Sequence, residues 1–484
     1  MGFSALDYAV LVAYLAASAA FGIWVGRGQK DLQGYFLGGR QMPWWAICFS
    51  IVATETSTLT FIGAPAIAYA GNLTFLQVAL GYCLGKILVS VVLMPGYLRG
   101  RIETAYELLN VRFGPQVRTA SALLFQVTRA LSDGVRLFAT AIVLTVVTEI
   151  SDSWTVIIIG AITVAYTLYG GMRAVVWSDV IHFFVYIAGA GLAFWVLLER
   201  IPGGWSEVAV VAGDKLQALD FALAFDRPYT FLGGLVGGAF LTFATHGTDH
   251  MMVQRYLSCG TLSGSRKALV TSGVVVFFQF LLFLVIGVML FAFYQHFPIE
   301  QQLTQTDRIF PIFIVEQMPP VISGLIIAAI FAAAMSTLSS SLNALASSTV
   351  HDFYRPFMAP QASQEHYLMV SRWLTLLWGV VLVGISFLAQ GWGSVLETGL
   401  TIASITMGSM LGIFLLGLLS RRAGQAAGLT GMTAGLAAML AVSGLTPIAW
   451  TWYVLIGTAV TLGVGLIYPQ RRQSMPTKPL TGRH

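Results

Sequence analysis

The chain has 484 residues, of which 57% are hydrophobic and only 10% are charged. A soluble globular protein normally carries about 25% charged residues. The composition therefore excludes a soluble protein and predicts an all-α integral membrane protein, because helices satisfy their own backbone hydrogen bonds in lipid. The net charge of +5 is explained below by topology, so binding to nucleic acid need not be invoked.

Thirteen apolar stretches follow one another along the chain, each long enough to cross a hydrocarbon core of about 30 Å. They lie near residues 4–26, 42–69, 74–98, 118–147, 153–170, 174–199, 229–252, 268–296, 319–350, 367–390, 393–419, 424–443 and 447–468. We expect one transmembrane domain over residues 1–470 and a disordered cytoplasmic tail over 471–484. The first stretch is predicted to be an uncleaved helix, because its positive charges follow the apolar run.

The distribution of the 26 Lys and Arg residues predicts the orientation. Three of them lie within spans, namely Lys86, Arg129 and Arg136. If the N-terminus is outside, only four lie outside, and the remaining nineteen are cytoplasmic. The four are Arg200, Lys215, Arg227 and Arg308. This bias is the positive-inside pattern of a multi-pass plasma-membrane protein whose C-terminus is cytoplasmic.

The second span contains a run of hydroxyl residues with one carboxylate, at residues 53–60. Thr and Ser side chains compete for backbone hydrogen bonds, so we expect an interrupted helix here. A second weak point occurs five spans later, at residues 243–250. Paired interruptions predict a five-plus-five inverted repeat over about 42–199 and 229–419, with the binding site between the halves. The alternative is two ordinary helices with polar packing faces.

Residues 331–348 place a dense cluster of hydroxyls at the centre of a span, which indicates a buried ion site. Beside the break in the second span, this helix would offer five neutral oxygens that suit sodium. They are the carbonyls of Ala53, Thr56 and Ala333 and the hydroxyls of Ser336 and Thr337. The alternative is that the hydroxyls only pack helices together.

Asp179 suggests a second sodium site. The hydroxyls of Ser339 and Ser340 lie three and four residues beyond Ser336, about one turn along the same helix. A carboxylate at Asp179 would complete a site with them. The alternative is an Asp179 exposed at the cytoplasmic interface.

Arg129, Asp133 and Arg136 share one helix face, at i, i+4 and i+7. If Asp133 pairs with one arginine, the other is left to bind an anion, and the arginine fork matches a carboxylate. Glu55 argues the other way, because it would hold an amine or neutralise one arginine. The predicted solute-binding residues are Thr54, Glu55, Ser57, Thr58, Thr60, Gln77, Arg129, Asp133, Arg136 and His246.

Other polar residues receive structural roles. We expect Lys86 and Glu397 to be paired or snorkelling groups, and His246 and His250 to form hydrogen bonds within the second broken helix. The glycines at residues 233–238 indicate close helix packing. No phosphate loop, nucleophile elbow or zinc motif is present, which argues against an ATP-driven pump and against an enzyme.

The sequence resembles the sodium:solute symporter family over nearly its whole length. Four segments carry the resemblance: residues 35–40 with Trp44-Trp45-Ala46, residues 104–107 with Arg112-Phe113, residues 166–175 leading to Asp179, and residues 332–337. The resemblance implies the five-plus-five fold with additional helices and the first sodium site named above. It also supports the second site, because members that couple two sodium ions have an Asp and hydroxyls at these positions.

The sialic acid carriers of that family are the most similar, through residues 339–343 and 253–256. Residues 132–136 and Glu55 depart from their pattern, so the solute does not transfer.

Together these features predict a sodium-coupled symporter that imports a small organic solute by alternating access, leaning to a carboxylate or sugar acid. Its partners are the solute, sodium and the lipid bilayer. The sequence does not determine the oligomeric state, and a monomer is consistent with it. One alternative is a carrier of a neutral sugar or amino acid, in which the charged residues form only an internal network. A channel or a solute sensor is the alternative from another class.

Overall fold

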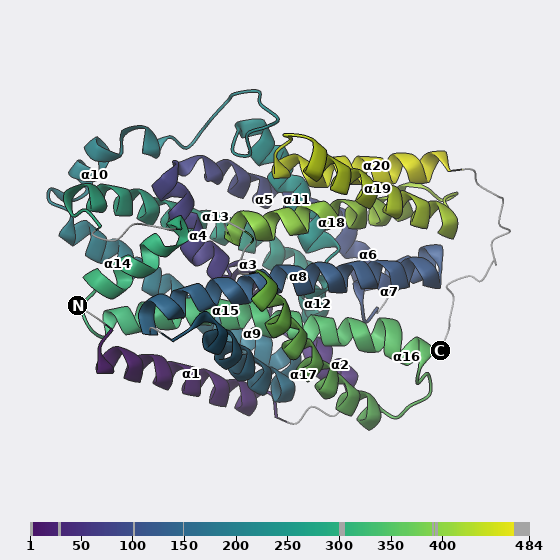
Figure 1. The fold of residues 1–484 in the computed structure, drawn as a ribbon. Coiled ribbons are helices and arrows are strands. Elements are labelled where there is room, and N and C mark those ends of the chain that lie inside the picture. The colour runs from purple at the N-terminus through teal and green to yellow at the C-terminus, as the bar shows by residue number, and fades with distance from the viewer. Residues whose placement is uncertain are drawn as a thin grey trace.

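The computed structural model describes residues 3–27, 31–99, 102–148, 150–299, 305–389, 392 and 395–468, and every regular element in these ranges is helical (Figure 1). The predicted tail at residues 471–484 lies outside the described residues. Nine of the described helices are long and apolar enough to cross a membrane, and a bent pair makes up to ten. The molecule is thus an all-helical multi-pass membrane protein.

The described residues form twenty α-helices, besides short 3₁₀ and π segments, and ten of these α-helices lie in the N-terminal half. They are α1 (Ala5–Val25), α2 (Leu32–Leu37), α3 (Trp44–Glu55), α4 (Thr58–Ala70), α5 (Leu76–Leu88), α6 (Met94–Arg99), α7 (Ala105–Phe113), α8 (Pro115–Thr148), α9 (Asp152–Arg200) and α10 (Gly204–Ala212).

The C-terminal half contains another ten. They are α11 (Gly238–Gly247), α12 (His250–Cys259), α13 (Leu262–His296), α14 (Ile309–Gln317), α15 (Ile322–Ser348), α16 (Arg355–Phe357), α17 (Gln364–Leu388), α18 (Val395–Leu419), α19 (Gln425–Leu445) and α20 (Tyr453–Ile467).

Three predicted spans, 118–147, 153–170 and 229–252, are not among these candidates for membrane-crossing helices. The helix α8 carries Arg129, Asp133 and Arg136 near its middle. The predicted span 229–252 is divided into α11 and α12 at Thr248. The long helix α9 is interrupted at Gly171, whose φ of 53° favours glycine, and the predicted spans 153–170 and 174–199 lie on either side of this break. The total of thirteen spans stays a prediction.

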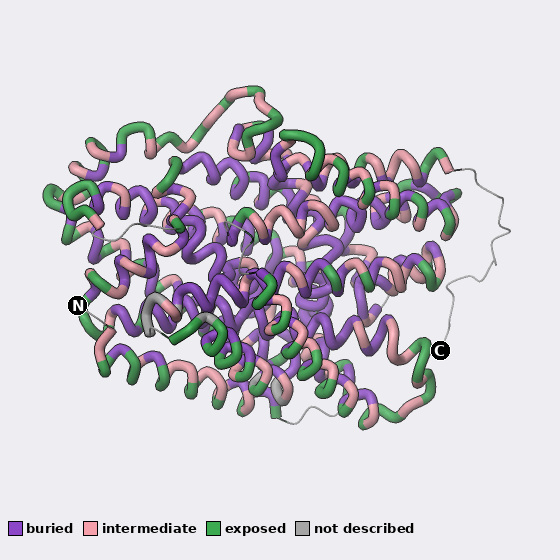
Figure 2. The backbone as a smooth tube through the Cα atoms, viewed as in Figure 1, coloured by how far each residue is buried: buried purple, intermediate pink, exposed green. Residues whose placement is uncertain are grey.

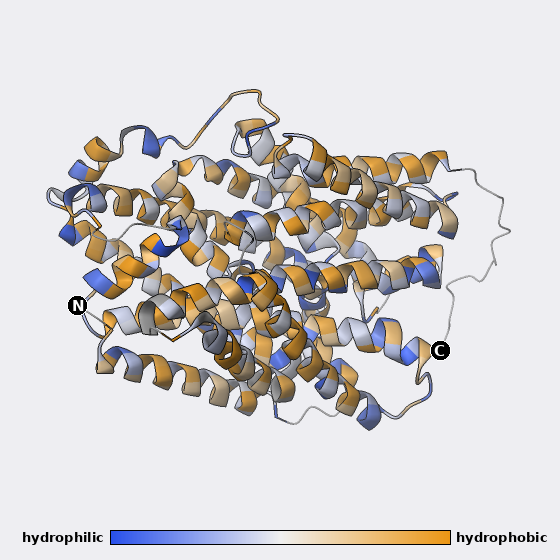
Figure 3. Ribbon diagram, in the orientation of Figure 1, coloured by the Kyte–Doolittle hydropathy of each residue, from blue (hydrophilic) through white to orange (hydrophobic). Residues whose placement is uncertain are grey.

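Burial ranks the helices from the centre outward (Figure 2). In α15, 89% of the apolar window is buried inside the protein, whereas in α1 only 11% is buried. Outer helices such as α1 and α17 present apolar side chains on their exposed faces, as the hydropathy colouring shows (Figure 3). Asp7 of α1 accepts hydrogen bonds from the Ser323 hydroxyl at 2.7 Å and the Gly324 amide at 3.0 Å, which fastens α1 to the start of α15.

The predicted close packing at the glycine cluster is confirmed. A Cβ atom added to Gly234 would lie 2.8 Å from Gln77 Cβ, and one added to Gly238 would lie 2.5 Å from the Val78 carbonyl oxygen. Glycine at these positions lets the segment that begins α11 lie directly against α5.

Candidate functional site

The second span is broken where the hydroxyl run predicts it. Helices α3 and α4 meet at a bend of 59°, and Thr56 has φ −82° and ψ 85°, outside the helical region. The Ser57 amide donates to the Glu55 carbonyl at 3.1 Å, and the Thr60 amide donates to the Ser57 carbonyl at 2.9 Å. The carbonyls of Ala53 and Thr56 therefore lose the amides that a continuous helix would give them, which leaves oxygen ligands at membrane depth.

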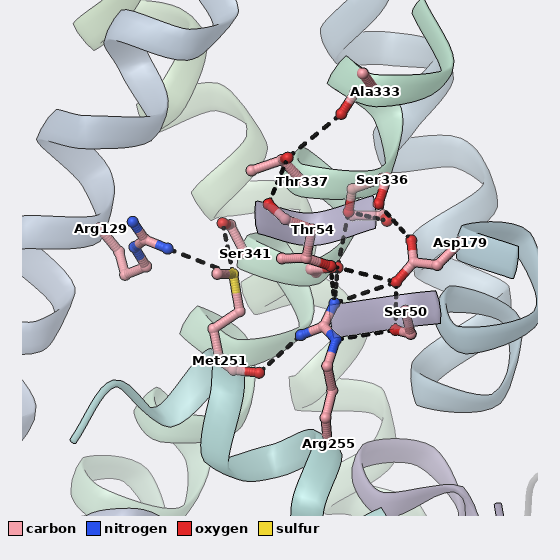
Figure 4. Close-up of polar contacts among 12 residues, drawn as sticks. Ser50, Thr54, Arg129, Asp179, Met251, Arg255, Ala333, Ser336, Thr337 and Ser341 are labelled. Atoms are coloured by element: carbon pink, nitrogen blue, oxygen red, sulfur yellow. Dashed lines mark hydrogen bonds and ion pairs between the residues drawn. The ribbon is translucent and has the colours of Figure 1, made fainter. Parts of the chain in front are cut away.

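Helix α15 packs against this break. The Thr337 hydroxyl lies 3.1 Å from the Thr54 carbonyl oxygen and 3.3 Å from the Ala333 carbonyl oxygen (Figure 4). Hydroxyl and carbonyl oxygens from the broken helix and from α15 therefore lie together, as the first sodium site requires. Thr56 accepts a hydrogen bond from the side-chain amide of Gln279 on α13, a neighbour that the sequence did not reveal.

Ser336 faces the other predicted site. Its hydroxyl donates to the Asp179 carboxylate at 2.7 Å, so a predicted ligand of the first sodium site contacts the carboxylate of the second. Asp179 is fully buried, which overturns the alternative of exposure at the interface. The Ser50 hydroxyl also donates to Asp179, at 2.5 Å.

Asp179 is already paired with a cation. Arg255 of α12 is fully buried, and its guanidinium lies 3.2 Å from the Asp179 carboxylate and hydrogen-bonds the hydroxyl of Ser340 (Figure 4). The predicted span 229–252 ends before Arg255, and that boundary is wrong because α12 continues to Cys259 and is buried along its length. Ser339 donates to the Ser336 carbonyl at 3.1 Å, so its hydroxyl is used within α15.

A cavity of about 100 Å³ lies beside the break. Most of the predicted solute residues line it, and its apolar wall is rich in aromatic and aliphatic side chains. The predicted residues on its lining are Thr54, Glu55, Ser57, Thr60, Arg129, Arg136 and His246. The apolar wall includes Phe75, Tyr82, Leu241, Phe280, Leu396 and Leu400.

Three predicted solute residues do not line the cavity. Gln77 is fully buried, and it donates to the Tyr229 carbonyl at 2.9 Å and accepts from the Asp220 amide at 2.9 Å, so it holds the loop before α11. Thr58 faces α8 and accepts from the Thr140 hydroxyl at 2.9 Å. Asp133 is fully buried and contacts Arg136 at 2.7 Å and Arg129 at 3.6 Å instead of the cavity. These three assignments are corrected, because a residue's place in the sequence does not fix the direction in which its side chain faces once the helices pack.

The charged residues of α8 form a balanced network. Asp133 lies 2.7 Å from Arg136 and 3.6 Å from Arg129, and Asp249, the N-cap residue of α12, lies 3.6 Å from Arg129. The expectation of an uncompensated arginine is therefore wrong, because the second repeat supplies another carboxylate. Arg136 still has a free edge, since its Nη1 holds Asp133 while its Nε has no hydrogen-bond partner among the described residues.

Glu55 is not a partner of these arginines. The fully buried ammonium of Lys86 lies 2.6 Å from its carboxylate, and His246 lies 3.4 Å away. Lys86 also donates to the Ser272 hydroxyl at 3.2 Å. The expectation that Lys86 is a paired structural group is confirmed, and Glu55 reaches the cavity as one half of this ion pair.

The polar residues of the second break behave as hydrogen-bonding groups. His250 lies 3.1 Å from the Ser347 hydroxyl and receives the Ala105 amide at 3.4 Å. Among the described residues, the group with a metal-like arrangement is Glu103, Glu107 and His351, none of which is a predicted site residue.

Sequence reasoning missed Arg255, Asp249 and Gln279 as members of the site. Arg255 lies in the segment 253–256 that resembles the sialic acid carriers, and Asp249 lies in the predicted helix interruption at residues 243–250. Both positions could therefore have been identified as candidates from the sequence. Gln279 could not, because a single glutamine in an apolar span is also a common packing residue.

A profile of the sodium:solute symporter family matches residues 35–435. The chain belongs to this family. A sodium/sialic acid symporter of Aliivibrio fischeri is 31% identical to this symporter over 96% of the chain and 93% of that protein. The human sodium/iodide cotransporter is 30% identical over 99% of the chain and 72% of its own length.

Structural similarity agrees with the family assignment. A solved structure of a Na⁺-coupled sialic acid symporter, in a substrate-bound outward-open state, matches the symporter with a TM-score of 0.89. The two are 28% identical, and the match covers 97% of this chain and 100% of the other. The predicted sodium-coupled symport is thereby confirmed, with sodium as the coupling ion.

Proposed function

We propose that the symporter imports a small carboxylate-bearing solute together with sodium across the plasma membrane, with its N-terminus outside and its C-terminus cytoplasmic. The proposed architecture is one domain over residues 1–470 with thirteen spans, ten of them in two inverted repeats over about 42–199 and 229–419. Two broken helices in corresponding places, α3–α4 and α11–α12, support this arrangement.

One observation carries the proposal: the Thr337 hydroxyl of α15 donates to the carbonyl of Thr54, which lies between the freed carbonyls of Ala53 and Thr56 in the broken helix. We assign the first sodium to the carbonyls of Ala53, Thr56 and Ala333 and the hydroxyls of Ser336 and Thr337. Neutral oxygens suit a monovalent ion that must also leave. Sodium would join the broken helix to α15, and its release to the cytoplasm would let the two separate during alternating access.

We assign the solute's carboxylate to Arg136. The Nε and Nη2 edge of a guanidinium binds a carboxylate through two parallel hydrogen bonds. In Arg136 the opposite nitrogen, Nη1, holds Asp133, Nε has no hydrogen-bond partner among the described residues, and the residue lines the cavity, so we assign the carboxylate to this edge. The sialic acid relatives carry acidic solutes by name, which agrees with this assignment.

The size and lining of the cavity limit the solute further. Its volume of about 100 Å³ is below the roughly 300–1,000 Å³ of pre-formed ligand pockets. We therefore expect either a compact solute or a pocket that widens when the solute binds. The apolar wall favours a solute with an apolar body beside its acid group.

The charge of the solute decides the driving force. One sodium with one monovalent carboxylate moves no net charge, so a tenfold sodium gradient supplies about 1.4 kcal/mol. A second sodium would add another gradient term and about 2.3 kcal/mol per 100 mV of membrane potential. The net charge moved with each solute molecule therefore gives the number of sodium ions coupled to its transport.

A neutral solute is the second candidate. Two arginines opposite two aspartates, Asp133 and Asp249, make an internally balanced network that needs no external anion. A carrier of a neutral sugar or amino acid would use Ser57, Thr60 and the other hydroxyls of the cavity. Such a carrier would be electrogenic with a single sodium.

Uptake into proteoliposomes tests the proposal. A screen by thermal shift, with and without sodium, first selects ligands among sugar acids, monocarboxylates, neutral sugars and amino acids. Uptake of the selected solute is then measured with sodium, potassium or a proton gradient. We expect carboxylates to stabilise the protein only with sodium present. Uptake at the same rate with and without a sodium gradient would refute sodium coupling. Selection of a neutral solute in the screen would refute the proposal that the solute carries a carboxylate.

A further inference from the structure

The buried guanidinium of Arg255 is held by oxygen atoms from three helices (Figure 4). Its Nε donates to the Ser50 hydroxyl at 2.9 Å. Its Nη2 donates to the hydroxyls of Thr54 and Ser340 and lies 3.2 Å from the Asp179 carboxylate. Ser50 and Thr54 belong to α3, Asp179 to α9 and Ser340 to α15. The side chain therefore fills a polar pocket formed by these three elements.

These oxygens are also the ones that a second sodium would need. A cation bound by Asp179 and Ser340 would have to lie among the atoms that now accept from Arg255. Two positive charges a few ångströms apart repel strongly in a buried site of low effective dielectric. One carboxylate cannot compensate both, and the arginine and a sodium ion therefore exclude one another at Asp179.

We propose that Arg255 is a tethered competitor of the second sodium ion, so that sodium binds Asp179 only when the guanidinium leaves. This inference rests on the proposed function, because it requires sodium to be the coupled ion. In the arrangement seen here the arginine stabilises Asp179 when the ion is absent, which prevents an uncompensated buried carboxylate.

Replacement of the Arg255 guanidinium by sodium at Asp179 would also affect the solute cavity, because Arg255 belongs to α12. Its Nη1 donates to the Met251 carbonyl at 2.8 Å, one turn earlier on the same helix. Met251 and Met252 line the cavity, and so does Asp249, which faces Arg129 at 3.6 Å. Withdrawal of Arg255 would therefore alter the helix that carries one wall of the cavity.

This connection couples the two ligands. If sodium at Asp179 moves α12 toward the arrangement that binds solute, then solute must raise sodium affinity by the same factor. Arg255 would thus be a positioning residue that transmits ion occupancy to the solute cavity.

Sodium titration of the thermal stability of the purified full-length protein tests the competition, with choline keeping the ionic strength constant. The variants are Arg255→Gln, Arg255→Lys, Asp179→Asn and the double variant Asp179→Asn/Arg255→Gln. The Asp179→Asn variant keeps only the first site, so its response identifies the second-site component in the others. We expect Arg255→Gln to lower the sodium concentration for half-saturation of that component at least tenfold.

The remaining variants provide the controls. Arg255→Lys keeps the tethered charge and should stay within threefold of the wild type, whereas the double variant should lose the gain because the carboxylate is gone. An unchanged or raised half-saturation in Arg255→Gln would overturn the inference. So would an equal gain in the double variant, which would show that Asp179 is not the ligand.

A measurement on the wild type keeps the test decisive if Arg255→Gln does not fold. Hydrogen exchange of residues 250–259 should be faster in sodium than in potassium, because the guanidinium that anchors α12 is released. Equal exchange in the two salts would overturn the inference while sodium-driven uptake stays intact. A wild type whose stability and uptake both ignore sodium would instead refute the proposed function, and this inference with it.

Discussion

Replacing Arg136 by glutamine tests the assignment of the solute's carboxylate. The substitution removes the guanidinium edge that we assign to the solute and keeps a polar side chain of moderate length beside the cavity. Asp133 loses its partner at 2.7 Å but keeps Arg129 at 3.6 Å, so the buried carboxylate still has a neighbouring cation. The variant should therefore fold and reach the membrane.

The magnitude follows from the hydrogen bonds that are lost. Hydrogen bonds to charged groups contribute about 1.5–3 kcal/mol. Since every 1.4 kcal/mol is a factor of ten, the KM for a carboxylate solute should rise about 10- to 140-fold. Arg136→Lys keeps the charge but has no planar fork, so its KM should lie between those of the wild type and Arg136→Gln.

The assay is sodium-driven uptake of the carboxylate selected by thermal shift, compared with binding of its amide analogue. Arg227→Gln is the matched control, because Arg227 is 56% exposed and lies outside the cavity, 3.3 Å from Asp220. A similar loss for acid and amide would refute the reasoning, since it would show a general effect on the pocket. An unchanged KM would refute it directly.

Three further predictions concern the ion site, the buried ion pair and the carboxylate of Glu103. Thr337→Val removes one hydroxyl ligand worth about 1 kcal/mol and should raise the sodium concentration for half-maximal uptake about fivefold, with an unchanged value counting against the first site. Lys86→Met leaves Glu55 buried without its cation and should cost about 3–5 kcal/mol in thermal unfolding, and the added change Glu55→Gln should restore most of it if the pair is structural. In the segment before α7, the hydrogen bond from His351, together with Arg355 at 3.0 Å, holds the pKa of Glu103 at about 2, below its usual 4.5. A lowered pKa stabilises the fold above pH 4.5 and loses this effect as the pH falls toward 2, so the melting difference between wild type and Glu103→Gln should shrink over that window.

The location of the first break was readable from the sequence because its cause is local. A run of threonines with a glutamate competes with the backbone of its own helix, and the bend occurs at Thr56. The assignment as a membrane protein also has a local cause. Each spanning helix must be apolar along its own length and must form its own backbone hydrogen bonds, so hydropathy detects it without knowledge of its neighbours. The balance of charge around the α8 arginines could not be read in this way, because Asp249 is far from them in the sequence.

What the sequence determined by itself was the membrane protein, its broken second span and the hydroxyl-rich helix that meets it. Only the tertiary structure decided the partners: Arg255 with Asp179, Lys86 with Glu55, and Gln77 with the loop before α11 rather than the cavity. The physical reason is that hydropathy and spacing act within one helix, whereas the pairing of buried charges depends on which helices pack together and how each is rotated about its axis.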